Sequence, residues 1–397
     1  MIKVNKTAIK NFIDDDVDDR NKSEIIIDNL FFLKDMEVKE YTLYKKHMEL
    51  QKYHEQHTNA VNIKDKIWKP IDFNDEKQTI KQIEDLQPEI FLIDNESVYK
   101  EAWLLLRVFG HTMAFDVNPG RFIKFLVVDK MTKKYLGVVS VASDVTSITV
   151  RDKYIGWTKD NKFKEHKLNH SAIGSCIMAL QPLGYNFLGG KLIASLLTTD
   201  IIRNIWKDKY NEALVGMTTT SLYGSESMYN NIPWWRKMGS SNGTIMLKPD
   251  DDIYQEWLDW IREEKYEVYK KLTRNEDGTV ATSPKQNILK YIFKQTHANI
   301  KEADLTHGFK RGVYYSLFYE NGCKFFKNEI QEDELIMKEK FVDGYDKVLN
   351  WWKPKAINRY KKLKEEGRLK PDVHFYDDII GKSWEETKEK YLKEVGR

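Results

Sequence analysis

The residues best suited to chemistry lie between Gln181 and Gly243. The stretch opens with QPLGYNFLGGKL and continues through TTTSLYGSESMYNNIPWWRKMG. Its first part places glycines between an apolar run and a helix-like segment, where backbone N–H groups can point at an anion. Its second part concentrates hydroxyl and aromatic side chains, a composition that suits a site for a flat, polar ligand.

The glycine-rich turn is the first candidate site. Its residues would hold a phosphate or another anion, with the lysine in the first helical turn aimed at the same charge. The alternative is a strand-to-helix turn that needs glycines only for positive φ angles. The residues concerned are Gln181, Gly184, Asn186, Gly189, Gly190 and Lys191.

The second candidate site combines hydroxyls and phenols. On a strand, Ser221, Tyr223 and Ser225 would share one face. Tyr229 would then begin the next helix, and a phenol with a pKa of about 10 can donate a proton to a leaving group. The alternative is a set of surface hydroxyls with satisfied hydrogen bonds. Of the adjacent residues Trp234 and Trp235, one is expected to line this site and the other to lie in the core.

Two smaller sets come from the middle of the chain. Arg151 and Asp152 beside Trp157 could bind a phosphate or a flipped base, or form a surface salt bridge beside a core tryptophan. Asp144, together with His111 or His170, could act as a base with its orienting partner or hold a metal. No metal-ligand spacing such as H-E-x-x-H is present.

A basic run near the C-terminus is the fifth candidate. It mixes positive charge with stacking faces from Trp351, Trp352 and Tyr360, so it could neutralise several phosphates and bind with an affinity that falls with salt. The alternative is a solvated helix face. The cations are Lys353, Lys355, Arg359, Lys361, Lys362, Lys364, Arg368 and Lys370.

Apolar patterning predicts the elements that position these residues. Alternating or continuous apolar runs predict strands over 121–129, 136–144, 171–184, 213–224 and 244–249, and a helix over 191–210. Residues 306–326 would add a strand pair or a tight turn. The order favours an α/β (α+β) fold with a mostly antiparallel central sheet. We expect an N-terminal helical region (1–98), a core (99–250) and a C-terminal helical, partly basic region (251–397).

Bulk composition limits the class of protein. The 397 residues are 41% hydrophobic and 31% charged, which is globular rather than disordered. Two cysteines argue against a disulfide framework and a cysteine-based zinc site. No apolar run has the length of a signal peptide or a membrane span, so we expect a soluble, cytoplasmic protein without a membrane partner. A net charge of +3 neither requires nor excludes nucleic acid.

Three ordered segments carry a resemblance to a known family. RDKYIGWT resembles the charged, aromatic IGW element of the DruA family of the Druantia anti-phage system. SAIGSCIMALQPLGYNFLGGKLIASLL resembles its strand, turn and helix, and TTTSLYGSESMYNNIPWWRKMGSSNG resembles its polar strand, tyrosine segment and glycine-containing tail. That family resembles the Mom-like DNA-modification proteins of phages, which have an acetyltransferase-like (GNAT) fold. The resemblance covers roughly residues 100–250.

The resemblance implies a way for the glycine turn to work. In acetyltransferase-like folds, a Gln/Arg-x-x-Gly-x-Gly/Ala turn offers backbone donors to a pyrophosphate. Gln181 and Gly184 match the first half of that turn, whereas Asn186 replaces the second small residue. The donor therefore stays unknown: acetyl-CoA or another activated group is open, and iron is implied only through the Mom-like proteins.

The resemblance also implies an activity. It is the transfer of an acyl or carbamoylmethyl-type group to adenine N6 of double-stranded DNA, on a base flipped out of the duplex. Tyr229 would be the general acid beside Tyr223, with Ser225 or Asp144 positioning the amine. The expected contacts to DNA are Arg151, Trp157, Trp234, Lys353, Lys355, Arg359, Lys361 and Lys362.

Two other functions stay open at this point. One is a non-catalytic DNA-binding component of an anti-phage defence or counter-defence system. The other is an acyltransferase that acts on a small molecule or a protein amine. Mass spectrometry of nucleosides separates a DNA-modifying enzyme from a DNA-binding protein, and coenzyme A binding without DNA affinity would identify the third.

Overall fold

The structure is a computed structural model that describes residues 17–116, 120–221, 227–276, 278, 281, 284–295 and 306–392. The chain forms two compact units, and each is considered by itself. Unit 1 consists of Met1–Tyr41 and Gly243–Phe309, and unit 2 consists of Thr42–Asn242 and Lys310–Arg397.

Unit 2 is built around a mixed sheet. Among the described residues, seven strands lie in the order β1-β2-β3-β4-β5-β7-β6, and the chain crosses the unit boundary within β6 and β7. The recorded neighbours pair antiparallel except for β4 and β5, which are parallel. The predicted α/β fold with a mostly antiparallel sheet is therefore confirmed. The strands are β1 Pro88–Ile93, β2 Phe122–Asp129, β3 Tyr135–Ser143, β4 Ser171–Ala179, β5 Gly216–Ser221, β6 Arg236–Met246 and β7 Thr306–Leu317.

Strand β2 shows why the central strands read as continuous apolar runs. Phe125 and Val127 belong to the hydrophobic core on one face of the sheet, and Leu126 and Val128 belong to the core on the other face. Successive side chains of a strand point to opposite faces, so a strand that is covered on both sides needs apolar residues at every position.

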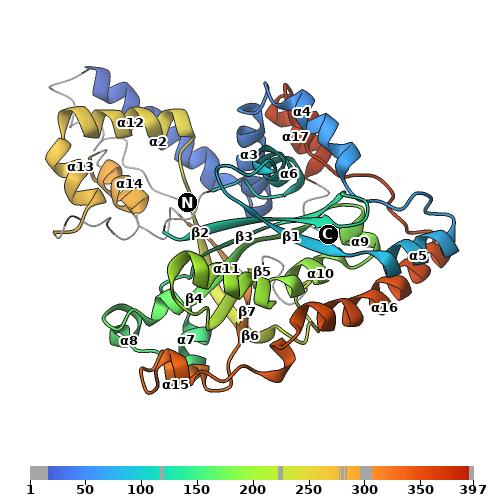
Figure 1. Ribbon diagram of the computed structural model, residues 1–397. Helices are drawn as coiled ribbons and strands as arrows, with labels where there is room; N and C mark the ends of the chain where they lie inside the picture. Colours follow the sequence, from blue (N-terminus) through green and yellow to red (C-terminus); the bar gives the residue numbers. More distant parts are fainter. Residues whose placement is uncertain are drawn as a thin grey trace. The chain divides into compact units, whose positions relative to one another are not determined.

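Helices cover both faces of this sheet (Figure 1). One face carries α3 Val38–Gln51, α4 His57–Ile63, α6 Lys100–Gly110 and α17 Trp384–Tyr391. The other carries α5 Glu76–Asp85, α9 Leu183–Asn186, α10 Gly189–Leu196, α11 Asp200–Tyr210 and α16 Gly344–Glu365. Shorter helices complete unit 2: α7 Thr149–Ile155, α8 Lys159–Phe163 and α15 Gly322–Phe326, with 3-10 turns η1 Lys64–Lys66, η2 Lys167–His170, η4 Glu332–Glu334, η5 Glu339–Phe341 and η6 Asp377–Ile379.

Apart from the ends of β6 and β7 that belong to it, unit 1 is helical where it is described. Asn29 joins two of its helices, because its Nδ2 donates to Asp250 Oδ2 at 2.8 Å while its Oδ1 accepts from the Asp250 N–H at 3.0 Å. Trp257 and Ile261 form the buried stripe of the helix that follows Asp250. The helices are α2 Val17–Asp35, α12 Asp251–Glu264, α13 Tyr266–Thr273 and α14 Pro284–Gln295.

Three local predictions differ from the structure. The helix expected over 191–210 is two helices, because Thr198 and Thr199 donate their hydroxyls to the carbonyls of Ser195 and Leu196 and end the first one. Residues 306–326 form the long strand β7 and helix α15, and β7 pairs with β5 about ninety residues earlier in the chain, a partner that local sequence does not reveal. Tyr229 lies in a turn rather than a helix. The three-region division (1–98, 99–250, 251–397) stays a prediction.

Candidate nucleic-acid interface

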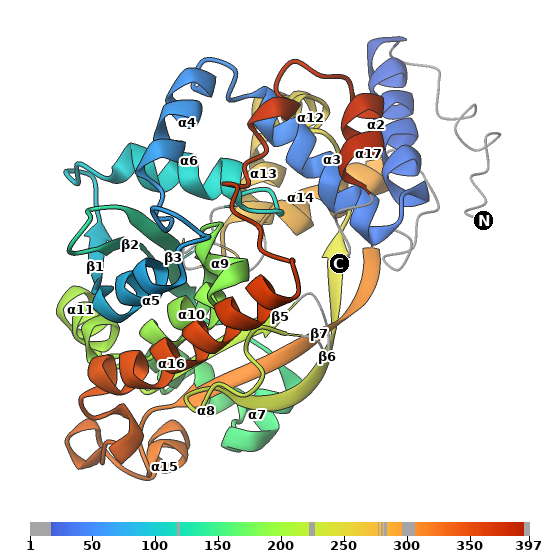
Figure 2. The ribbon, with the colours of Figure 1, turned by 90° about the vertical axis from the view of Figure 1, so that its right-hand side faces the viewer.

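Helix α16 contains most of the predicted basic run. Its buried apolar side chains determine the directions in which the basic side chains point. The buried residues recur every three or four positions, which forms one stripe along the helix. Helix α16 lies against α5, α9 and α10 (Figure 2). The buried stripe faces these helices, so the cations between its members lie on the flanks and the solvent side. The stripe consists of Val348, Leu349, Trp352, Ala356, Tyr360 and Leu363.

The flank of α16 toward α5 is used for docking. Lys353 Nζ donates to the Glu84 carbonyl at 2.5 Å, and Lys364 Nζ donates to the Asn74 carbonyl at 2.9 Å. Lys364 also pairs with Glu76 at 3.4 Å. Lys353, which was expected to contact nucleic acid, therefore has its ammonium on a backbone carbonyl of the same protein.

The opposite flank presents cations beside two aromatic rings. Lys355 Nζ lies 5.3 Å from the centre of the Trp351 ring, and the Arg359 guanidinium lies 5.2 Å from the centre of the Tyr185 ring. Lys370 lies 4.8 Å from that same Tyr185 ring. With Arg368, whose charge interacts with Tyr185, these residues form what we call the α9–α16 patch: Tyr185, Trp351, Lys355, Arg359, Arg368 and Lys370.

The α9–α16 patch carries an excess of positive charge. Within the described residues, the ion pairs recorded for its cations go to one carboxylate, Glu366, which contacts Arg368 and also pairs with neighbouring Lys362 at 3.9 Å. Lys361 is exposed on the solvent side of the same helix. The pKa of Lys191 is lowered by burial and then by the positive charge of Lys355. Like charges thus repel one another here, which favours an anionic ligand.

The glycine-rich turn places Tyr185 in this patch. Gln181 precedes a cis peptide bond to Pro182, and its Oε1 accepts from the Tyr185 N–H at 2.9 Å. Asn186 is fully buried and binds the segment after α16: its Nδ2 donates to the Lys370 carbonyl, and its Oδ1 accepts from the Lys370 N–H. The turn and the end of the basic run are therefore one structural unit.

The glycines of the turn allow close packing. A Cβ atom at Gly184 would lie 2.8 Å from the Gln181 amide nitrogen, and one at Gly189 would lie 2.9 Å from the Leu183 backbone carbonyl. Trp352 covers the turn, with its Nε1 donating to the carbonyls of Phe187 and Leu188 at 3.0 and 3.2 Å. The turn expected to receive a donor molecule thus packs against its own chain.

The glycine turn and the tyrosine-containing segment lie in contact with each other. Lys191 Nζ donates to the carbonyls of Met228 and Asn230, and Met228 Sδ would lie 2.8 Å from a Cβ atom at Gly190. Trp235 Nε1 donates to the Ala194 carbonyl in α10 at 2.8 Å. These contacts fill the junction with side chains of the protein.

Tyr229 lies buried beside the place where β4 and β5 separate. Its hydroxyl lies 3.3 Å from Thr219 Oγ1, which donates to the Gly174 carbonyl at 3.1 Å. The ring packs against those of Tyr314 and Trp235. Burial raises the pKa of Tyr229, although the Thr219 hydrogen bond opposes the rise. Tyr223 and Ser225, expected beside it, lie outside the described residues.

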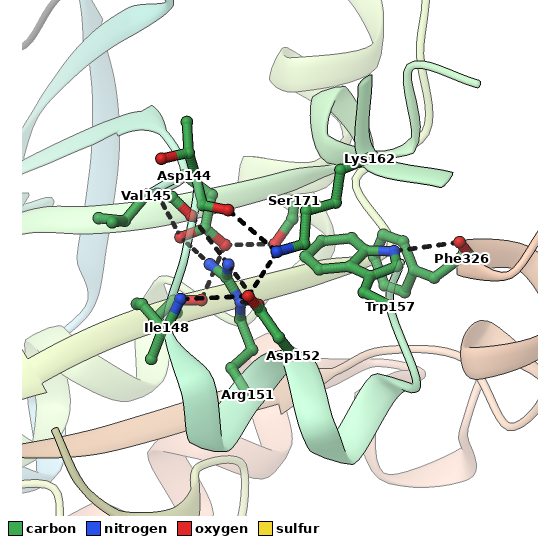
Figure 3. A network of polar contacts seen from close by, with 11 residues as sticks. Asp144, Val145, Ile148, Arg151, Asp152, Trp157, Lys162, Ser171 and Phe326 are labelled. Carbon is green, nitrogen blue, oxygen red and sulfur yellow. Dashed lines mark hydrogen bonds and ion pairs between the residues drawn. The ribbon is translucent and has the colours of Figure 1, made fainter. Parts of the chain in front are cut away.

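Asp144 and Arg151 form a buried network together with Asp152 and Lys162 (Figure 3). Arg151 Nη1 lies 2.7 Å from Asp144 Oδ1, and Arg151 Nη2 lies 2.7 Å from Asp152 Oδ1. Ser171 and Thr218 donate their hydroxyls to Asp144 Oδ2, and Lys162 pairs with Asp152. Burial raises the pKa of Asp144, opposed by the charge of Arg151. Because Arg151 is 0% exposed, a phosphate contact would require this network to open.

The two tryptophans expected at the DNA are engaged in packing. Trp157 Nε1 donates to the Phe326 carbonyl at 3.0 Å, and its ring lies under Arg151. Trp234 is buried and donates from Nε1 to the Lys340 carbonyl at 3.0 Å. Its ring meets that of Trp351 edge-on, with the centres 5.4 Å apart. Trp234 therefore supports the patch from beneath instead of lining it.

Comparisons with known proteins show the family of the chain. The family described as Druantia protein DruA matches residues 35–328, which is more than half of the chain. The chain belongs to the DruA family. Druantia protein DruA of Escherichia coli (strain UMEA 4076-1) is 26% identical over 278 residues, covering 64% of this chain and 65% of that protein. The chain thus spans less than two thirds of that relative's length. No solved structure matches it.

The DruA match includes Tyr185, which the sequence analysis did not propose as a site residue. In the sequence, Tyr185 stands between Gly184 and Asn186. An aromatic residue inside a glycine-rich turn is a signal that could have identified Tyr185 as a site residue. The match ends before α16, so the cations of the patch lie beyond the matched residues.

Among the described residues of this DruA-family chain, no group of three His, Cys, Asp or Glu side chains is placed to hold a metal ion. Within the same residues, every helix is too short or too polar to cross a bilayer.

Proposed function

We propose that this DruA-family protein is a non-catalytic DNA-binding component of a Druantia-type anti-phage defence system. Membership of the DruA family supports the assignment to the defence system, and the α9–α16 patch supports the binding of DNA. The observation that carries the proposal is the group of cations around Tyr185, of which, within the described residues, Arg368 alone has a recorded ion pair, to Glu366. Neither half of the proposal requires a reaction at Tyr229.

The physical reason is electrostatic. Cations held close together by a folded scaffold repel one another, and a polyanion relieves that repulsion while it releases its own counterions. Lys355 and Arg359 lie one helical turn apart on α16, and Lys370 is held beside them by Asn186. The charges are therefore positioned before any ligand arrives, which reduces the entropic cost of binding.

The test is a salt titration of DNA binding with charge-reversed variants. Lys355→Glu/Arg359→Glu should weaken binding of a fluorescein-labelled 20-base oligonucleotide by at least about tenfold near physiological salt. It should also reduce the slope of log K against log salt by about one to two. The matched control is Lys159→Glu/Lys164→Glu, which changes the same charge at two exposed positions beside α8.

Two results would contradict the proposal. One is a wild-type protein that binds neither single-stranded nor duplex DNA at low salt. The other is equal loss of affinity in the patch variant and the control, because net charge alone would then account for binding. Circular dichroism and thermal unfolding establish that each variant is folded before its affinity is compared.

The transferase that the resemblance implies is a second candidate, and one observation favours it. β4 and β5 pair only at Ser171–Ile173 and Gly216–Thr218. The pairing ends beside Tyr229, which is where the resemblance would put an acyl-type donor. Nucleosides from DNA co-expressed with the protein would then contain a new adduct by mass spectrometry, and Tyr229→Phe would abolish it. If the DNA is unmodified, the transferase candidate is excluded and DNA binding is the one proposed function that remains.

A further inference from the structure

The α9–α16 patch contains aromatic rings in addition to the cations that binding of a duplex requires. Contacts to the phosphates of double-stranded DNA need cations and hydrogen-bond donors. This patch also holds Tyr185 and Trp351, both partly exposed, and each has a cation against its ring. Aromatic faces beside a cationic track are the feature that distinguishes surfaces for unpaired strands, because an unpaired base can stack on them.

Tyr185 differs from the other tyrosines of this face. Tyr360 and Tyr314 are buried in the hydrophobic core, whereas the Tyr185 ring lies against the cations of Arg359 and Lys370. A ring placed among cations at the surface contributes little to the core. It is suited to a ligand that brings both a π-face and a negative charge, as a nucleotide does.

The spacing along α16 fits an extended strand. Trp351, Lys355 and Arg359 follow one another at intervals of four residues, so about 6 Å of helix separates each from the next. They therefore form a line of one ring followed by two charges, and the line ends at the Tyr185 ring. A single strand can lie along such a line with successive phosphates on the cations, since its backbone is not held in a double helix.

The rings are also held in place. Trp234 supports Trp351 edge-on from below, and the Trp352 indole anchors α16 to the carbonyls of Phe187 and Leu188. On the other side, Asn186 fixes the backbone of Lys370. Both stacking faces thus belong to rigid elements, which suits a preformed binding surface.

We propose, on the basis of the nucleic-acid binding proposed above, that the α9–α16 patch selects single-stranded nucleic acid over duplex. Lys355, Arg359 and Lys370 hold phosphates. One base stacks on Trp351, and another stacks on the Tyr185–Arg359 pair, whose guanidinium plane extends the aromatic face. The 2′-hydroxyl contacts that would distinguish RNA from DNA are left to the experiment.

Fluorescence anisotropy of the full chain tests this selection with three labelled probes at one salt concentration: dT20, rU20 and a 20-base-pair duplex. We expect the protein to bind dT20, rU20 or both at least about tenfold tighter than the duplex. Tyr185→Ala should weaken single-strand binding by about tenfold and leave duplex binding within twofold. Tyr185→Phe, which keeps the ring and loses the hydroxyl, should retain at least half of the affinity.

A second measurement needs no variant. Ultraviolet crosslinking of an oligonucleotide that contains 5-iododeoxyuridine, followed by mass spectrometry, should place the crosslink on Tyr185 or Trp351. Duplex bound as tightly as both dT20 and rU20, Tyr185→Ala without effect on the single strand that binds tighter, or crosslinks elsewhere would each overturn the single-strand inference while the DNA-binding proposal stands. A chain that binds none of the three probes would instead remove the DNA-binding proposal itself.

Discussion

The side chain of Asn186 and the backbone of Lys370 form two hydrogen bonds: Asn186 Nδ2 donates to the Lys370 carbonyl at 2.6 Å, and its Oδ1 accepts from the Lys370 N–H at 2.9 Å. A third bond, from Nδ2 to the Pro182 carbonyl at 3.1 Å, joins the same amide to the turn before α9. One buried amide thus fixes a turn and a segment 184 residues later in the chain. This connection places Lys370 over the Tyr185 ring.

Replacement of Asn186 by alanine should therefore affect both stability and binding. The loss of a buried hydrogen-bonding side chain leaves the Lys370 backbone groups without this partner, at a cost of about 1–3 kcal/mol. Urea unfolding measures that cost, and the affinity for dT20 should fall because Lys370 is released. Asn59→Ala is the control, since Asn59 makes an exposed side-chain contact with Glu101. Equal stability of the two variants would contradict this account.

Gly189 and Gly190 are adjacent, yet alanine should have opposite effects at the two positions. At Gly189 the new Cβ atom would meet backbone atoms of Leu183 at 2.9 Å, which cannot move aside, so we expect a loss of at least about 1 kcal/mol. At Gly190 the nearest atom is the sulfur of Met228, the end of a flexible side chain. Alanine there should be neutral or stabilise α10 by up to about 1 kcal/mol, because it favours helix more than glycine does.

Thermal unfolding of both glycine variants, with DNA affinity as a second readout, checks this prediction. If the two glycines instead serve mainly to receive an anion on their N–H groups, both variants should lose ligand affinity while their stability changes little. Equal destabilisation at the two positions would contradict the packing argument, since it distinguishes a backbone neighbour from a side-chain neighbour.

The sequence predicted strands β2 to β5 and the basic run, because apolar periodicity reports which residues are buried, but β1 lies in the region that was expected to be helical. Apolar periodicity does not report which helix or strand packs against a given face of another. Lys353 and Lys355 are two residues apart in the same run, but Lys353 faces α5 and Lys355 faces Trp351. The prediction grouped them because both are lysines beside aromatic residues. Their different surroundings come from α5, which lies nearly 270 residues earlier.

Arg151 shows the same limit for charged residues. An arginine next to an aspartate in sequence is compatible with a phosphate site or with an ion pair, and both alternatives were open. Asp144, seven residues earlier, decides the local arrangement by facing Arg151 from the end of β3. Two carboxylates balance Arg151 and Lys162, so the whole group can be buried at a tolerable desolvation cost.

This buried network makes a further prediction. Arg151→Met leaves the Asp144 carboxylate buried without its main partner and should cost about 3–5 kcal/mol. The double variant Asp144→Leu/Arg151→Met removes both charges and should lose less stability than Arg151→Met alone. Urea unfolding of Arg151→Met, Asp144→Leu and the double variant measures the coupling between the two residues. Additive losses of stability would contradict the ion pair. The folded Arg151→Met protein should keep the wild-type salt slope for DNA, because Arg151 is buried away from solvent.

The lowered pKa values of three histidines lead to a prediction of how the free energy of unfolding depends on pH. Burial lowers the pKa of His47, His111 and His170, and the charges of Arg107 and Lys46 lower that of His111 further. His111 Nδ1 accepts from the Met113 N–H at 3.0 Å, a bond that a protonated Nδ1 cannot make. A histidine in the unfolded chain has a pKa of about 6.5. Below that pH the unfolded state therefore takes up protons that the folded state excludes.

The sign follows from this difference in proton uptake. The stabilising contribution of each histidine is complete above about pH 6.5 and is lost as the pH falls through that value toward the lower folded-state pKa. The free energy of unfolding should decrease by up to about 1.4 kcal/mol per pH unit for each histidine. Urea unfolding at pH 7.5 and pH 5.5 measures the loss. His111→Gln keeps an acceptor for Met113 and should reduce it, whereas His54→Gln, at an exposed position, should not. An equal pH dependence in wild type and His111→Gln would show that His111 is not among the groups responsible.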